Sequence, residues 1–207
     1  MKYNKAEESI RERLLVAGIK ELENHGFNDF SLRRVANLCN VSCAAPYKHF
    51  KNKEELLFAL MDYISSRWYI LRDRVIECYK DSTPQKRLTA VCVAYLRFLL
   101  ATPSYITILT MYPSETNLDN GLRVKISEPI ARIIEEIIPS EPRFAALRSL
   151  CAYSIRAYIY GTACMIRNKE VESVEETVRL FDSVLDRIIG DAQTKMEKII
   201  QESEKQQ

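Results

Sequence analysis

The segment from Ser31 to Lys53, SLRRVANLCNVSCAAPYKHFKNK, constrains the fold of this chain more than any other stretch. It predicts two short helices that are joined by a tight turn and followed at once by the start of a long helix. Ser31 and Ser42 belong to the residue types that cap helix N-termini, and each precedes one of the short helices. Asn52 is a third cap, and Glu55 follows three residues later as its capping-box partner.

Positive charge is concentrated in the same region. Residues 24–53 carry five basic side chains and one acid, a net charge of +4 in a chain whose formal total is +2. A local basic patch of this kind is the electrostatic footprint of a nucleic-acid reader. Arg33 and Arg34 stand in the first turn of the first short helix, where cations oppose the helix dipole. A row of phosphates is therefore expected to balance them.

The second short helix is expected to run from Cys43 to Phe50 and to enter a groove of DNA. Its first residues are small, which allows a close approach to the groove floor, and its last residues carry hydrogen-bonding groups. Lys53 opens the long helix, where its ammonium and the helix N-terminus are expected to share one phosphate. The residues predicted to bind DNA are Ser31, Arg33, Ser42, Cys43, Ala44, Ala45, Tyr47, Lys48, His49 and Lys53.

The run from Gly26 to Leu56 resembles the N-terminal DNA-binding domain of TetR-family (tetracycline-repressor-like) transcriptional regulators. The residues that carry the resemblance are Gly26-Phe27, Ser31, Val35-Ala36, Val41-Ser42, Tyr47-Lys48-His49-Phe50 and Lys53-Glu54-Glu55-Leu56. It covers about the first quarter of the chain. It implies an all-α fold in which a three-helix helix-turn-helix DNA-binding domain, residues 1–52, is joined by a long helix to a helical ligand-binding and dimerisation domain, residues 53–207.

Three positions depart from the family pattern. Asn40 replaces the usual turn glycine, and asparagine accepts left-handed backbone angles. Ala44 stands where glycine is frequent. Pro46 replaces the usual leucine or isoleucine, and because proline is tolerated only in the first turn of a helix, the recognition helix is expected to start no earlier than about Ser42.

The remainder of the chain predicts helices and no strand. Apolar residues recur at spacings of three and four from Leu57 to Val75, which indicates one long helix from Glu54 to about Asp81. Before it, a helix is expected over residues 6–25, with Gly26 as its C-cap. After it, helices are expected over residues 84–101, from 102 to before 113, up to 138, over 141–167 and over 173–200, with a polar loop at 113–121.

Aromatic and sulfur-containing side chains are frequent in the middle of the chain. Any one of them is explained by a plain helical core, but as a group they favour a mostly apolar pocket with a few polar anchors. The resemblance adds that family members commonly bind a small molecule in this region. The residues predicted to bind this ligand are Trp68, Tyr95, Phe98, Met111, Tyr112, Tyr153, Arg156 and Tyr160.

Taken together, these patterns predict a homodimeric regulator of transcription, expected to be a repressor. It would bind a palindromic operator in double-stranded DNA and leave it when a largely apolar or aromatic effector binds. Two recognition helices that read successive major grooves favour a dimer, and the resemblance implies that the last two helices form the dimer interface. The alternative is a helical adaptor without specific DNA binding, which would not explain the local positive charge.

Other classes of protein find little support. The chain has no Ser/His/Asp set, no metal-ligand cluster and no Gly-rich phosphate loop, so no enzyme activity, no metal and no cofactor is expected. No apolar stretch approaches the roughly 20 residues of a membrane span, and a cytoplasmic protein is expected. The six cysteines are scattered singly, which is typical of reduced thiols, and Cys43 is the most exposed candidate for a redox sensor.

Overall fold

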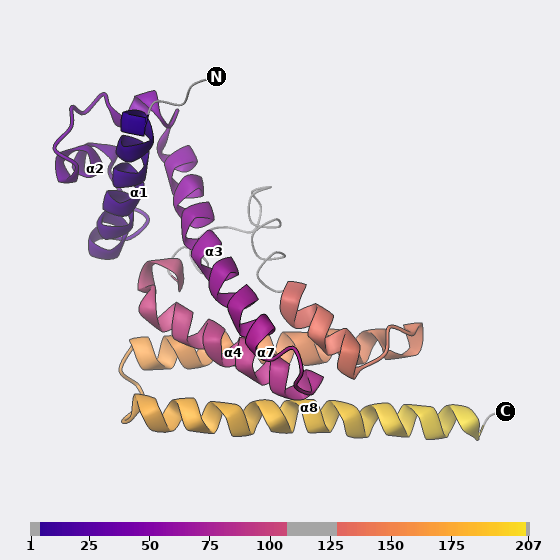
Figure 1. Cartoon of the computed structure of the whole chain (residues 1–207). Helices are drawn as coiled ribbons and strands as arrows, with labels where there is room; N and C mark the ends of the chain where they lie inside the picture. Colours follow the sequence, from indigo (N-terminus) through magenta and orange to yellow (C-terminus); the bar gives the residue numbers. More distant parts are fainter. Residues whose placement is uncertain (1–4, 107–127, 206–207) are drawn as a thin grey trace. The chain divides into compact units, whose positions relative to one another are not determined.

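The computed structural model describes residues 5–106 and 128–205, and within these ranges the regular elements are helices without a strand (Figure 1). The chain divides into two compact units. The first comprises Met1–Arg67 with Thr102–Leu122, and the second comprises Trp68–Ala101 with Arg123–Gln207. The all-α prediction is confirmed. The division into compact units falls within one helix, whereas a functional boundary at residues 52 and 53 stays a prediction.

The first unit contains α1 (Lys5–His25), α2 (Leu32–Leu38), the 3₁₀ helix η1 (Pro46–Lys48) and the first part of α3 (Lys53–Cys78). Helix α1 packs on α2, and both face a core of large apolar side chains. This core includes Leu14, Leu22, Val35, Phe50, Leu56, Leu57 and Leu60. Helix α1 ends as expected at Gly26, whose φ of 72° suits glycine, and the Gly26 amide donates to the Leu22 carbonyl at 2.9 Å.

A buried carboxylate joins α1 to the start of α2. Glu21 is only 1% exposed, and one of its oxygens accepts from the backbone amide of Ser31 at 3.2 Å. The same oxygen lies 2.7 Å from Nε of Arg34, and the other lies 3.2 Å from Nδ1 of His25. A buried carboxylate is stable only when its oxygens are hydrogen-bonded, so these three donors explain why it is tolerated.

The turn after α2 has the geometry that the sequence predicts. Asn40 adopts a φ of 53°, the left-handed conformation expected of it. The Val41 amide reaches back to the Ala36 carbonyl at 3.1 Å, which satisfies a terminal carbonyl of α2. The cap of α3 is also confirmed, because the Glu55 amide donates to Oδ1 of Asn52 at 2.8 Å. Glu55 returns a bond to the amide of Lys51, one residue earlier than in a standard capping box.

The second unit contains the rest of α3, α4 (Pro84–Ala101), helical residues 128–137, the 3₁₀ helix η2 (Pro142–Phe144), α7 (Ala145–Arg167) and α8 (Val174–Glu204). Helix α4 packs against both α7 and α8, and α8 lies alongside α7 (Figure 1). The prediction of one helix from 141 to 167 is corrected at its start, because a 3₁₀ turn precedes α7. The short helix predicted before residue 113 begins at 103, but its end and the predicted loop at 113–121 lie outside the described residues.

The Glu21 interaction leads to a stability prediction. Glu21→Gln keeps the side-chain size but removes the charge that holds Arg34, so we expect the free energy of unfolding to fall by about 1–2 kcal/mol. This is less than the loss for a fully buried ion pair, because the Arg34 side chain is 42% exposed.

Urea unfolding at fixed protein concentration measures the change. Glu23→Gln, on the same helix and exposed, is the matched control and should stay within about 0.5 kcal/mol of the original protein. Equal losses in both variants would show that the buried carboxylate contributes nothing specific.

Candidate nucleic-acid interface and ligand cavities

The predicted recognition helix is shorter than expected. In place of a helix from Cys43 to Phe50, residues 43–45 form a turn and η1 follows from Pro46 to Lys48. The Ala45 amide bonds to the Ser42 carbonyl at 2.9 Å, but Pro46 has no N–H with which to continue the ladder. The proline instead occupies the first position of the 3₁₀ helix, where no donor is required. The predicted helix from Cys43 to Phe50 is therefore too long, and Pro46 is the residue that shortens it.

Most of the predicted base-reading residues are accessible. Ser42, Cys43 and Ala44 are exposed, whereas Ala45 is half-buried. In η1, Pro46 is buried, whereas Tyr47 is 59% exposed and Lys48 is exposed. Pro46 therefore packs in the core at the position where the family pattern has leucine or isoleucine. The surface left for DNA consists of small side chains beside a tyrosine and a lysine.

The two arginines of α2 have different environments. Arg34 is held by the Glu21 carboxylate and by the carbonyl of Asp29, so an internal anion balances its charge. Arg33 is exposed, and no hydrogen bond or ion pair is observed for it among the described residues. The interpretation that both arginines await an external anion is therefore wrong for Arg34, and for Arg33 it stays a prediction. Ser31 occupies the N-cap position of α2, but its side chain makes no capping bond. The Ser31 backbone amide donates to the Glu21 carboxylate.

Lys53 has protein partners of its own. Its ammonium donates to the carbonyls of Phe27 at 2.9 Å and Asn28 at 3.2 Å, and it lies over the rings of Phe27 and Phe30. An ammonium has three N–H donors, so one remains for a phosphate. The side chain thus ties the start of α3 to the loop between α1 and α2. His49, the remaining predicted contact, is half-buried.

The predicted ligand residues are partly brought together in a cavity of about 260 Å³ between residues 128–137 and α7, here called the α7 cavity. Four of the eight line it: Tyr95, Tyr153, Arg156 and Tyr160. Its other lining residues are Ile130, Ala131, Ser149, Ala152 and Ile159. Sequence reasoning missed these because it favoured large aromatic side chains. The spacing of the α7 members, three or four residues apart from 149 to 160, is the helical signal that could have found them.

Two further predicted residues lie in the core instead. Trp68 is fully buried, with its ring centroid 4.7 Å from that of Tyr95 and 5.6 Å from that of Phe98. The Tyr95 hydroxyl lies 3.3 Å from the Tyr160 hydroxyl, so this aromatic cluster reaches the wall of the α7 cavity. Trp68 and Phe98 are thus not lining residues of this cavity. The last two predicted residues, Met111 and Tyr112, lie outside the described residues.

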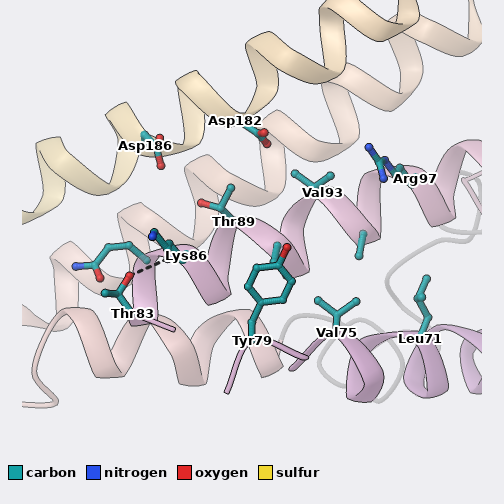
Figure 2. A pocket seen from close by; sticks show the side chains of 13 residues that line it. Leu71, Val75, Tyr79, Thr83, Lys86, Thr89, Val93, Arg97, Asp182 and Asp186 are labelled. Atoms are coloured by element: carbon teal, nitrogen blue, oxygen red, sulfur yellow. Dashed lines mark hydrogen bonds between the residues drawn. The ribbon is translucent and has the colours of Figure 1, made fainter. Parts of the chain in front are cut away.

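A larger opening, about 850 Å³, lies between the second half of α3, α4 and α8, and none of the predicted residues lines it (Figure 2). Apolar side chains of α3 and α4, such as Val75 and Val93, alternate with Lys86 and Arg97 of α4. Asp182 and Asp186 of α8 face them in Figure 2. Burial raises the pKa of Asp182, the Asp186 carboxylate raises it further, and Arg97 opposes the shift. We call this opening the α3–α4–α8 groove.

A third cavity, about 430 Å³, contains three arginines and is here called the arginine cavity. Each arginine has a carboxylate partner. Arg72 pairs with Asp73 at 2.6 Å, Arg132 pairs with Glu128 at 2.5 Å, and Arg87 pairs with Glu136. The full lining is Arg72, Asp73, Ile76, Arg87, Glu128, Pro129, Arg132, Ile133 and Glu136.

All six cysteines are free, and their environments differ. Burial raises the pKa of the Cys39, Cys92 and Cys151 thiols, which disfavours the reactive thiolate. Cys43 and Cys78 are exposed. Cys43 is therefore accessible as expected, but it shares that property with Cys78. Within the described residues, no group of three or more potential ligands is placed to hold a metal ion.

The sequence and the fold were also compared with those of known proteins. Residues 14–60, which span most of α1, all of α2 and η1 and the start of α3, match the family model described as bacterial regulatory proteins, tetR family. This segment of the chain is a TetR-type DNA-binding domain. Its recognition from the sequence is thereby confirmed, and with it a DNA-binding regulator of transcription. No curated protein matches the chain.

Several solved structures share its fold. A protein of unknown function from Rhodococcus sp. RHA1 is 25% identical with a TM-score of 0.67, over 86% of this chain and 94% of that one. A TetR-like transcriptional regulator from the same source is 16% identical with a TM-score of 0.67, over 90% and 97%. AibR, in complex with isovaleryl coenzyme A and operator DNA, is 18% identical with a TM-score of 0.65, over 85% and 97%. None of the described helices is long and apolar enough to cross a membrane.

The contrast between the arginines of α2 gives a test of the interface. Arg33→Ala should weaken DNA binding and reduce the slope of log K against log salt by about one phosphate contact, because a free surface cation is lost. Binding titrations at several salt concentrations measure the slope.

Lys195→Ala, an exposed lysine of α8, is the matched control and should leave both quantities unchanged. An unaltered slope in Arg33→Ala would remove this residue from the phosphate contacts.

Proposed function

We propose that the protein is a homodimeric transcriptional repressor that leaves its operator when a small molecule binds the α7 cavity. The observation that carries the proposal is the mostly apolar α7 cavity in a chain that also bears an accessible TetR-type reader. A DNA reader must share a compartment with the chromosome, so the proposal is of a cytoplasmic protein. Neither an enzymatic role nor an adaptor role has an observation of its own in its favour.

In this proposal the exposed residues of the turn 43–45 and η1 contact the operator. The alanine methyl of Ala44 suits the methyl group of thymine, and Tyr47 and Lys48 supply hydrogen bonds at the groove edge. Arg33 contributes a free cation for a phosphate. Lys53 has fewer N–H donors left for a phosphate than the sequence suggested, since two carbonyls already accept from its ammonium. It positions the loop between α1 and α2 against the reader instead.

Exposed apolar side chains on α7 and α8 support the dimer. Leu150 and Met165 of α7 are about half exposed, and Leu180 of α8 is 57% exposed. Positions 150, 157, 161 and 165 recur at helical spacing, and a Cβ at Gly161 would meet open space. Unpartnered apolar side chains of this kind favour an interface with a second copy. Two copies then present two readers to a palindromic site.

The placement of the effector follows from comparing the three openings. The α3–α4–α8 groove is wide and carries acids and bases in equal number, and the arginine cavity has its charges paired internally. In the α7 cavity, apolar walls meet several hydroxyl groups and Arg156, for which no ion pair is observed among the described residues. AibR was solved with isovaleryl coenzyme A and operator DNA, and this supports a regulator that binds both a small molecule and DNA here. The effector acts through its different affinity for the DNA-bound and released conformations.

The deciding experiment is selection of DNA from a random pool by the purified protein at two salt concentrations. A palindrome with half-sites about one helical turn apart supports the dimeric reader. The selected DNA then reports release by candidate compounds. Trp68 provides a second signal, since it is the only tryptophan and its ring touches the wall of the α7 cavity through Tyr95. Enrichment of no sequence by ligand-free protein would contradict sequence-specific reading.

The dimer is tested by charge on the apolar surface. Leu180→Glu places a carboxylate where the proposal buries an apolar side chain, so sedimentation should show a shift toward monomer and weaker binding to the selected palindrome.

Asn37→Glu on α2 is the matched control, because it adds the same charge at an exposed site of the other unit. It should leave the dimer intact. A dimer that is equally stable in both variants would place the interface elsewhere.

A further inference from the structure

We propose that the effector is a small carboxylic acid with an apolar body about the size of one aromatic ring. This inference rests on the proposed function, because it concerns the occupant of the α7 cavity. The charges of the lining residues indicate the head group of the ligand, and the volume of the cavity indicates the size of its apolar body.

The head group follows from the charges of the lining. Among the described residues that line the α7 cavity, Arg156 is the one charged side chain and none is a carboxylate. The Arg156 side chain is exposed, so it is accessible to a ligand from solvent. No ion pair is observed for Arg156 among the described residues, whereas the three arginines of the arginine cavity each have an acidic partner. A guanidinium presents paired N–H donors in a plane that matches the two oxygens of a carboxylate. An anion is therefore the ligand that completes this cavity.

Hydroxyl groups supply further donors beside Arg156. Tyr153 and Ser149 come from the same face of α7, and Tyr160 lies one helical turn further along. The Tyr95 and Tyr160 hydroxyls form a pair at 3.3 Å on the wall of the cavity. A carboxylate has only acceptor sites, so a lining of hydroxyls and a guanidinium suits it better than an amine, which needs acceptors.

The size of the body follows from the volume and the walls. The cavity measures about 260 Å³, just below the roughly 300–1,000 Å³ typical of sites for drug-sized ligands. Its remaining walls are Ile130, Ala131, Ala152 and Ile159, which offer apolar surface for a ring or a short branched chain. The volume matches a single ring or a short chain and is small beside a coenzyme A thioester such as the ligand of AibR.

The test uses acids and their neutral amides as matched probes. Benzoate and hexanoate represent a ring and a chain with a carboxylate, while benzamide and hexanamide keep each shape without the charge. Binding to the full chain is measured by calorimetry and by Trp68 emission. We expect each acid to bind about tenfold or more tightly than its amide, from the strength of hydrogen bonds between charged groups. Amides that bind as tightly as the acids would overturn the proposal.

Two variants locate the charge that is responsible. Arg156→Gln should remove the preference for acids, whereas Arg167→Gln, in the last turn of the same helix and outside the lining, should keep it. Tyr160→Phe retains the ring and should weaken acid binding to a smaller degree. A preference that survives in Arg156→Gln would overturn the assignment of this residue.

The outcomes also separate the effector class from the proposed function. If no acid binds, while a neutral compound shifts Trp68 emission and releases the selected DNA, the carboxylate class is wrong and the effector-controlled repressor stands. If the acids bind through Arg156 but DNA occupancy does not change, the carboxylate site is established and release by this cavity is wrong. Acids that bind through Arg156 and release the DNA support both.

Discussion

The buried Glu21 carboxylate is the interaction on which the DNA-reading unit depends. It draws its donors from three places: the end of α1, the first amide before α2 and a side chain within α2. Helix α2 has only seven residues, too few for a helix to be stable alone in water. Its position is therefore set from outside, by a charge that belongs to the neighbouring helix. That charge also neutralises Arg34, so of the two arginines of α2 it is Arg33 that faces solvent without an ion pair among the described residues.

Much of the reading unit could be predicted because its signals are local. The Gly26 cap, the left-handed Asn40 and the Asn52–Glu55 cap each depend on a few consecutive residues, and the structure confirms all three. The interpretation of Arg34 was wrong because its partner is distant in sequence: Glu21 lies 13 residues away. The carbonyl partners of Lys53 lie about 25 residues away and were likewise not foreseen, while its contact with a phosphate stays a prediction. Pairings of this kind leave no periodic trace in the sequence.

The ligand cavity was only partly predictable for a related reason. Aromatic content indicated Tyr95 and Tyr160, which line the cavity and meet across 65 residues of sequence, but it could not separate residues of the cavity wall from residues of the core. Trp68 is buried behind the wall, while small residues such as Ala152 form part of it. Which large side chain faces a void depends on how helices pack, and small side chains define a void as much as large ones do. The sequence also does not show which arginines have an acidic partner. The structure shows such partners for the three arginines of the arginine cavity.

The short η1 segment limits how much information a single copy of this protein can extract from DNA. A good pair of contacts to one base distinguishes it from the wrong base by about 1–3 kcal/mol, and three residues after a turn can make few such pairs. A genome offers an enormous number of competing sites, so the preference of one such reader for its own site is too small to select that site. Doubling the reader multiplies the discrimination of the two halves. Occupancy of the right site then rises with the square of protein abundance at low concentration, and regulation becomes a question of how many copies the cell contains.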